Sequence, residues 1–215
     1  MTRNIKAIGL AVLAILAMSA FAASAAQAAP EFEASETGET MGSGGAGETF
    51  STEAGDVVCS SSTFVGNATS KKATTEKTHP TYSGCKAFGF LSATVNTEKC
   101  DYVFHPKTKI SETEYTATVA VDCASSSESI KVVASTCSAE IKETGELNHV
   151  IFTNKTKEGK MDLTVDATVS SIPYTVTNDG FLCPFSGKGN KTDGEYTTTS
   201  PITYTGIGDI TVVGS

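Results

Sequence analysis

Apolar and polar residues alternate with a period of two along most of the chain from Thr49 onward. Between Tyr115 and Cys123 every second residue is apolar, and threonine, alanine and aspartate fill the positions between them. One face of such a segment packs inward and the other meets water, as in an antiparallel strand. The same alternation recurs in the segments 100–104, 161–169 and 172–176. Threonine is abundant at the outward positions, which suits a pleated, solvated surface.

Turn signals separate these segments. Glycine stands beside polar or acidic residues at 54–56, 144–146, 178–180 and 193–194, and such sequences favour tight turns between strands. Helical periodicity is nearly absent after residue 28. The pattern predicts an all-β chain, built as an antiparallel β-sandwich or two packed β-sheets with an Ig-like general architecture.

The first 28 residues have the organisation of a helical secretory signal. Arg3 and Lys6 precede the apolar run 7–22, and Ala26 and Ala28 supply the small residues that signal peptidase requires. The run is shorter than the roughly 20 residues that span a bilayer. We therefore expect residues 1–28 to be a signal peptide, and the mature chain to be secreted without a membrane span or held loosely at the surface by non-covalent contacts.

The mature chain divides by composition into two parts. Residues 29–47 are rich in glutamate and glycine, have little apolar surface to offset the entropy of ordering, and predict a flexible acidic leader. Residues 48–215 predict the β-rich domain. The sequence leaves open whether that domain is one unit or two subdomains with a boundary near 108–114.

Six cysteines lie after the signal, which indicates disulfides formed in an oxidising compartment. Six cysteines allow 15 connectivities. Short loops favour Cys85–Cys100 and Cys123–Cys137, which leaves Cys59–Cys183. A hairpin turning near 109–111 would instead place Cys100 opposite Cys123. No two cysteines have the C-x2-C to C-x4-C spacing of a zinc site, so we expect no metal there.

Charge and composition exclude one class of partner. Removing the signal lowers the formal net charge from −8 to −10, and Arg3 is the only arginine in the sequence. Nucleic-acid surfaces are basic and rich in arginine. We therefore expect no nucleic-acid partner. Tryptophan is absent, which weakens the prediction of a sugar-stacking platform and leaves that role to tyrosine.

A search for catalytic and metal-binding patterns finds none. His79, His105 and His149 lie in no H-x-x-x-H array, and no G-x-S-x-G elbow falls between a strand and a helix. Asp162 and Asp166 would stand about 13 Å apart on one strand face, which exceeds the separation in most paired-carboxylate mechanisms. We predict no catalytic residue, cofactor or metal ligand, and an enzyme is the less favoured class.

Two loops and three sequons remain as weaker candidates. The segments 178–179 and 190–195 offer oxygen ligands for calcium, without the D-x-[DN]-x-[DN]-G pattern of a dedicated loop. Asn67, Asn154 and Asn190 each begin an N-x-Thr sequon, which matters only in a host that glycosylates secreted asparagines.

Several short segments resemble a group of uncharacterised secreted, cysteine-containing β-rich proteins of soil bacteria. These segments are PTYSGCKAFGF at 80–90, ATV at 93–95, CDY at 100–102, VDATVSSIPY at 165–174 and DGEY at 193–196. The likeness extends from Phe50 to Gly214. It implies export and a shared disulfide-linked β fold, and supplies no activity and no functional residue.

These observations favour a secreted, non-enzymatic structural or interaction domain of adhesion type. Its partner is unknown, and a cell-envelope or extracellular polymer is the candidate class. The alternative is a secreted hydrolase, or a small-ligand or calcium-binding protein, whose site forms only in three dimensions. Convergence of His79, His105 and His149 around a cleft would favour the alternative.

Overall fold

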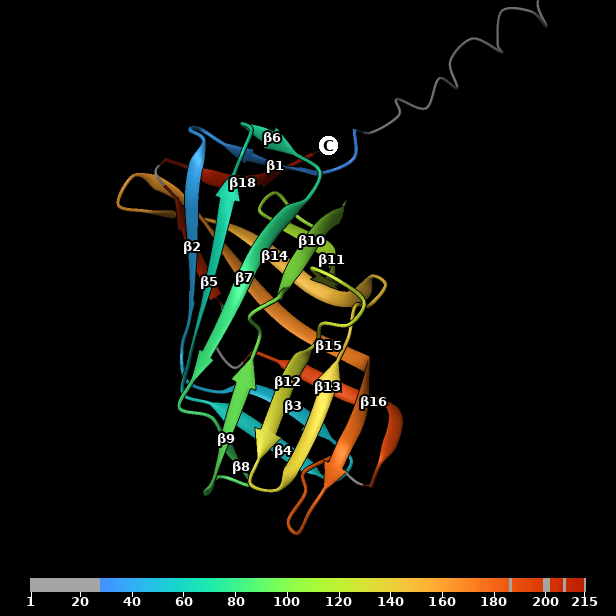
Figure 1. Ribbon diagram of the computed structural model, residues 1–215. Coiled ribbons are helices and arrows are strands. Elements are labelled where there is room, and N and C mark those ends of the chain that lie inside the picture. The colour runs from blue at the N-terminus through green and yellow to red at the C-terminus, as the bar shows by residue number, and fades with distance from the viewer. Residues whose placement is uncertain (1–27, 186, 199–201, 207, 215) are drawn as a thin grey trace, which may run out of the picture.

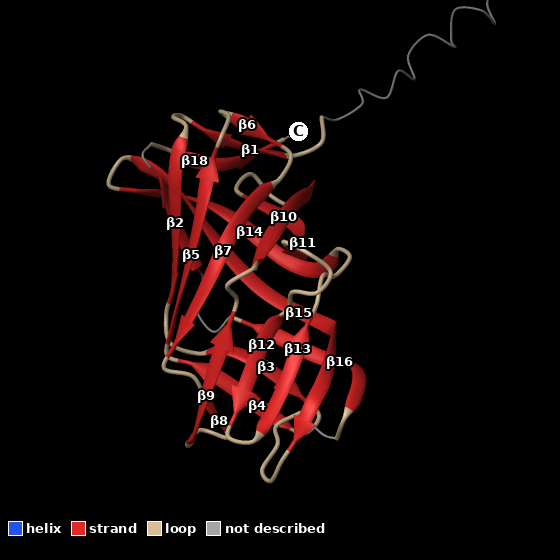
Figure 2. Cartoon of the chain, viewed as in Figure 1, coloured by secondary structure: helices blue, strands red, loops and turns tan. Residues whose placement is uncertain are grey.

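The computed structural model describes residues 28–185, 187–198, 202–206 and 208–214. The predicted signal peptide 1–28 therefore lies almost entirely outside the described residues. The described chain folds into strands without a helix (Figure 2), which confirms the all-β prediction. It contains no helix long and apolar enough to cross a membrane.

Eight antiparallel strands close into a first barrel, in which each strand pairs with two neighbours. In order around the ring they are β2 (Gly38–Gly44), β5 (Ser61–Ala68), β7 (Glu76–Ser83), β10 (Cys100–Lys109), β11 (Glu114–Cys123), β14 (Leu147–Lys157), β15 (Lys160–Asp179) and β17 (Ile202–Gly206). Pairing of β17 with both β2 and β15 closes the ring. Closure removes free strand edges, so this part of the fold is a barrel and not the open-sheet sandwich that the alternation predicted.

A second ring forms around the other half of β15. Its remaining strands are β13 (Cys137–Ile141), β12 (Ile130–Ala134), β9 (Leu91–Asn96), β8 (Lys86–Ala87), β4 (Gly55–Cys59), β3 (Glu48–Thr52) and β16 (Gly189–Thr197). The pairings β15–β16 and β13–β15 close it. Figure 1 shows β15 running from the upper ring into the lower one.

The passage of β15 between the rings occurs at a bulge. Its buried apolar residues have odd numbers up to Val169 and even numbers from Ile172 onward. The pairing with β16 shifts register between these two residues, and Ser171 has a positive φ of 60°. An inserted residue reverses which face a side chain occupies. The bulge therefore keeps the apolar residues of β15 inward in both rings.

A three-stranded sheet covers the upper end of the first barrel (Figure 1). It consists of β1 (Glu31–Ala34), β6 (Lys72–Ala73) and β18 (Ile210–Val213). Phe32 of β1 packs edge-to-face on Phe152 with ring centroids 5.3 Å apart, and Phe152 packs likewise on Phe104 at 5.6 Å. This end of the barrel is thus closed by an apolar cap.

The structure differs from the expected flexible leader. Residues 29–47 contain β1 and β2, and alternate residues in these strands are buried, including Phe32, Ala34 and Thr40. Glycine here serves close packing, because a Cβ on Gly44 would lie 2.2 Å from Glu48 Oε1. Composition indicated disorder, whereas two buried strand faces offset the ordering entropy. The suggested subdomain boundary at 108–114 is likewise the turn of the β10–β11 hairpin.

All six cysteines form disulfides, with a connectivity that corrects the expected one. The pairs are Cys59–Cys85, Cys100–Cys123 and Cys137–Cys183, in place of Cys85–Cys100, Cys123–Cys137 and Cys59–Cys183. Cys100 and Cys123 are direct partners in the β10–β11 register, as the hairpin alternative required. Loop length misled the first expectation, because strand register and not sequence separation brings the sulfurs of Cys100 and Cys123 together. Cys183 lies in the loop between β15 and β16 and reaches Cys137 without a strand pairing.

Candidate functional site

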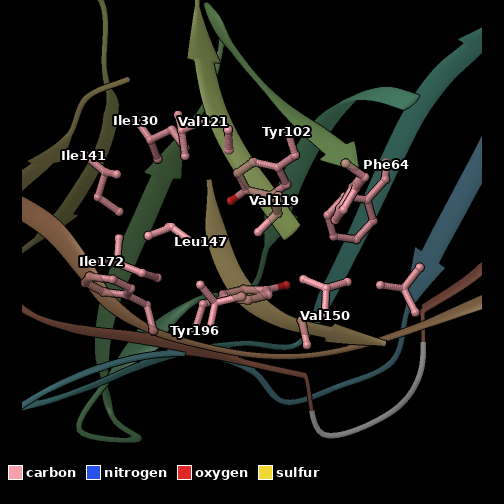
Figure 3. Close-up of a pocket in the computed structure, with 16 residues that line it drawn as sticks. Phe64, Tyr102, Val119, Val121, Ile130, Ile141, Leu147, Val150, Ile172 and Tyr196 are labelled. Atoms are coloured by element: carbon pink, nitrogen blue, oxygen red, sulfur yellow. The ribbon is translucent and has the colours of Figure 1, made fainter. Parts of the chain in front are cut away.

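The interiors of the two rings meet in an apolar cavity of about 70 Å³. Its lining comes from strands of both rings, as Figure 3 shows for the labelled side chains: Phe64, Tyr102, Val119, Val121, Ile130, Ile141, Leu147, Val150, Ile172 and Tyr196. An unfilled cavity costs about 24 cal/mol per Å³ in stability, so one of this size costs about 1.7 kcal/mol. Packing elsewhere in the two closed rings must offset this cost in the free energy of folding.

A buried polar cluster adjoins the cavity at the junction of the rings. Glu48, at the start of β3, is only 2% exposed and accepts a hydrogen bond from the Tyr196 hydroxyl of β16. The hydroxyls of Tyr82 and Tyr102, on β7 and β10, lie 2.9 Å apart. The Ser62 hydroxyl of β5 lies beside the Glu48 carboxyl near Gly44.

Burial controls the ionisation of this cluster. Desolvation raises the pKa of Glu48, and the hydrogen bond from Tyr196 opposes it only in part. Burial also raises the pKa of Tyr102 to about 12. Burial therefore extends the pH range over which the Glu48 carboxyl is neutral, and the neutral form is the one that an apolar surrounding favours.

A short connection lies over the junction on one side. Along one edge of β15, the residues up to Ala167 pair with β14 and those from Thr175 onward pair with β13. The stretch between Ala167 and Thr175 pairs with neither strand on this edge. The chain crosses from β13 to β14 through residues 142–146, which we call the strap. Val119 and Leu147, which line the cavity, are half-buried beside it.

The strap is attached to the first barrel by polar contacts. Thr144 exchanges hydrogen bonds with the backbone of Val121, at 3.0 and 2.9 Å. Glu146 accepts a hydrogen bond of 2.7 Å from Thr118 and pairs with Lys107 at 2.6 Å. The hydrogen bond from Lys107 is the main cause that lowers the pKa of Glu146. These contacts fix the strap without covering it by apolar packing.

The three histidines do not converge. His79 Nδ1 lies 2.9 Å from Asp101 Oδ1 on the outer face of the first barrel, and Lys77 bridges Asp101 and Asp122 at 3.3 and 2.7 Å. His105 lies 3.9 Å from Glu146. His149 is exposed, at a positive φ of 72° in β14.

The carboxylates near the histidines do not form a metal site. Among the described residues no three or more histidines, cysteines or carboxylates are grouped so as to hold a metal ion. A histidine–carboxylate pair alone supplies no nucleophile. The geometry thus lacks the convergence that would have favoured the enzyme alternative.

The remaining sequence candidates lie apart from the cavity. Asp162 and Asp166 lie on β15 opposite Lys155 and Ile151. Asn154 is used internally, since its amide donates to Val212 O at 2.7 Å and accepts from Val212 N at 2.9 Å. Asn190 accepts a hydrogen bond from Thr175 at the exposed start of β16, and Asn67 lies on β5 opposite Glu39.

The end of the second ring that lies away from the first barrel presents apolar side chains to solvent. The loop between β15 and β16 carries both Phe185, which is fully buried, and Phe181, which is 85% exposed. The β8–β9 loop, at the same end of the ring by the antiparallel strand order, carries Phe90, 67% exposed, with its ring 6.5 Å from that of Phe88. Leu182 is also exposed. We call these four residues, Phe88, Phe90, Phe181 and Leu182, the apolar end.

The loops of the apolar end are held in place by specific contacts. Cys183 is bonded to Cys137 at the β12–β13 turn, and Thr52 donates a hydrogen bond of 2.5 Å to Pro184 O. Phe88 N donates to Asp56 O at 3.1 Å. The loops that carry the exposed rings are thus anchored, and they lie at the lower end of the molecule in Figure 1.

Sequence reasoning missed both the cavity and the apolar end. Glu48 and Tyr196 are 148 residues apart, and no local pattern links them. The exposed phenylalanines carried a signal, because Phe88, Phe90 and Phe181 each stand next to a glycine or a loop signal and outside any alternating run. Comparison with known proteins yields no match to a family model, a curated protein or a solved structure.

Proposed function

We propose that this chain is an exported, non-enzymatic interaction domain that attaches to its partner through the apolar end. The observation that carries the proposal is the position of Phe90 and Phe181, two largely exposed aromatic side chains on anchored loops at one end of the molecule. Large exposed apolar groups gathered in one place mark interaction sites. Loops held before binding lose less entropy when they bind.

The charge of the chain defines the kind of partner. A mature formal charge of −10 with no arginine repels anionic polymers and anionic membranes. The partner surface therefore has no net negative charge and offers apolar groups to the exposed rings, as does a zwitterionic lipid layer or an apolar patch of an envelope component. Secretion, which the three disulfides fit, places the domain where such surfaces are reached.

The test is cosedimentation of the mature chain with phosphatidylcholine vesicles and, separately, with washed envelopes of the producing cells. We expect the wild-type chain to sediment with at least one of them, and the double variant F90S/F181S to lose at least tenfold of that binding. Met41→Ser is the matched control, because Met41 is 52% exposed on β2 of the other barrel. Equal binding by F90S/F181S and wild type, or no binding to either material, would overturn the proposal.

A further inference from the structure

The cavity at the junction of the rings is unusual for the interior of a small β protein, because close packing normally leaves few voids larger than a water molecule. Its volume is about 70 Å³, and almost all of its lining is apolar. Cavities of this kind stay dry and accept apolar guests. The hydroxyl-bearing side chains in the lining are Tyr102 and Tyr196.

The lining determines the chemical class of a guest. It contains no charged side chain, so an ionised guest would be desolvated without a partner. Beyond Tyr196 lies the buried carboxyl of Glu48, which disfavours an anion further. The guest must therefore be uncharged where it occupies the cavity.

The size of the cavity determines the shape of the guest. An engineered apolar cavity of about 150 Å³ takes a benzene ring. The present cavity has about half that volume. It suits the last few carbons of an aliphatic chain, with the rest of the molecule directed outward.

The strap lies between Ile141 and Leu147, two residues that line the cavity. It joins β13 to β14 across the stretch of β15 between Ala167 and Thr175, where neither strand continues the ladder. Gly145 in the strap has no heavy atom within 4 Å of a built Cβ. Contacts from Thr118 and Lys107 to Glu146, together with those of Thr144, hold it closed. A segment fixed by a few exposed or part-buried polar contacts opens at low cost compared with a packed strand.

We propose that the cavity binds the end of an aliphatic chain of a small uncharged molecule, which enters beneath the strap. This site is independent of the apolar end: it lies at the junction of the rings, whereas the apolar end is the far tip of the second barrel. Binding of an alkyl chain therefore neither requires nor excludes attachment through Phe90 and Phe181.

The test uses the mature chain and the series of n-alkanols from butanol to octanol, with binding measured by chemical-shift titration. Each added CH2 is expected to strengthen binding about fourfold, until the chain fills the cavity and the affinity levels off. Ala167→Leu fills part of the cavity and is expected to weaken octanol binding at least tenfold. Val133→Leu, on the outer face of β12, is the control and should bind as the wild type does.

Two further variants keep the test independent of folding defects. Val169→Leu adds a single carbon to the lining. In this variant the gain in affinity per CH2 should stop at a shorter alkanol than in the wild type. Glu146→Gln removes the ion pair with Lys107 and should speed the exchange of bound octanol more than it changes the dissociation constant. Affinity that rises without levelling off, equal binding by the filled and wild-type proteins, or no saturable binding would each overturn the proposal.

Discussion

Replacing Glu48 with glutamine tests the burial of the polar cluster at the junction. Glu48 is 2% exposed, and burial is the largest cause that raises its pKa. Glutamine has nearly the same shape, keeps a carbonyl oxygen to accept the Tyr196 hydrogen bond, and cannot ionise. The substitution therefore removes the ionisation and retains most of the packing.

The sign of the effect follows from linkage. In the unfolded chain a glutamate ionises with a pKa of about 4.3, and in the folded chain Glu48 ionises at a higher pH. Below pH 4 the group is protonated in both states and costs nothing. As pH rises from about 4.3 to the raised pKa, only the unfolded state ionises, so the wild-type protein loses stability. Each unit of raised pKa removes about 1.4 kcal/mol.

The assay is urea unfolding of both proteins between pH 4 and pH 8. We expect the free energies of unfolding to agree within about 1 kcal/mol at pH 4. E48Q should then become progressively more stable than wild type, by about 1.4 kcal/mol for each unit of raised pKa. Burial also raises the pKa of Glu76, but that contribution is common to both proteins and cancels in the difference.

Glu112→Gln is the matched control, because this side chain is 96% exposed and the substitution makes the same chemical change. It should not change the shape of the pH profile. A constant difference between E48Q and wild type from pH 4 to pH 8 would refute the reasoning, since a truly buried carboxyl cannot ionise as it does in the unfolded chain.

Two further substitutions test the packing and the disulfides. Gly44→Ala should lower the free energy of unfolding, measured in urea, by about 1–3 kcal/mol. The reason is that the added Cβ would lie 2.2 Å from Glu48 Oε1 and 2.3 Å from Ser62 Oγ. Gly145→Ala is the control and should cost far less, because the space around Gly145 is open. Removing the Cys100–Cys123 bond, with its sequence separation of 23, by a double alanine substitution should cost about 3.4 kcal/mol in the chain-entropy model. A urea-unfolding curve of Gly44→Ala that matches wild type would contradict the packing prediction. An undiminished free energy of unfolding without the Cys100–Cys123 bond would contradict the disulfide prediction.

The sequence was a good guide where a feature is local. Alternation located β11 and the first half of β10, and it placed Cys100 opposite Cys123 in one of the two alternatives. The change of phase in β15, from Val169 to Ile172, is also visible in the sequence, although alternation alone cannot show that the two runs are one strand. Period-two patterns report which face is buried and are the same in a sandwich and in a barrel.

The features that the sequence did not reveal depend on distant partners. Closure of the first barrel requires β17 to pair with β2, some 160 residues earlier in the chain. The acidic strand β2 is ordered because neighbouring strands supply the burial that its own composition lacks. The cavity depends on side chains from both rings, and the apolar end depends on loops that only the completed fold brings to one tip. Contacts between residues so far apart in the chain produce no recognisable spacing pattern in the sequence.

The central claim of this account is that two closed rings share β15, and the disulfide connectivity tests it most directly. Lysines fall between every two consecutive cysteines, so trypsin places the six cysteines on six different peptides. Mass spectrometry of the unreduced digest of the mature protein should find Cys59–Cys85, Cys100–Cys123 and Cys137–Cys183. Detection of Cys85–Cys100, Cys123–Cys137 or Cys59–Cys183 as the main pairs would contradict the strand register on which both rings depend.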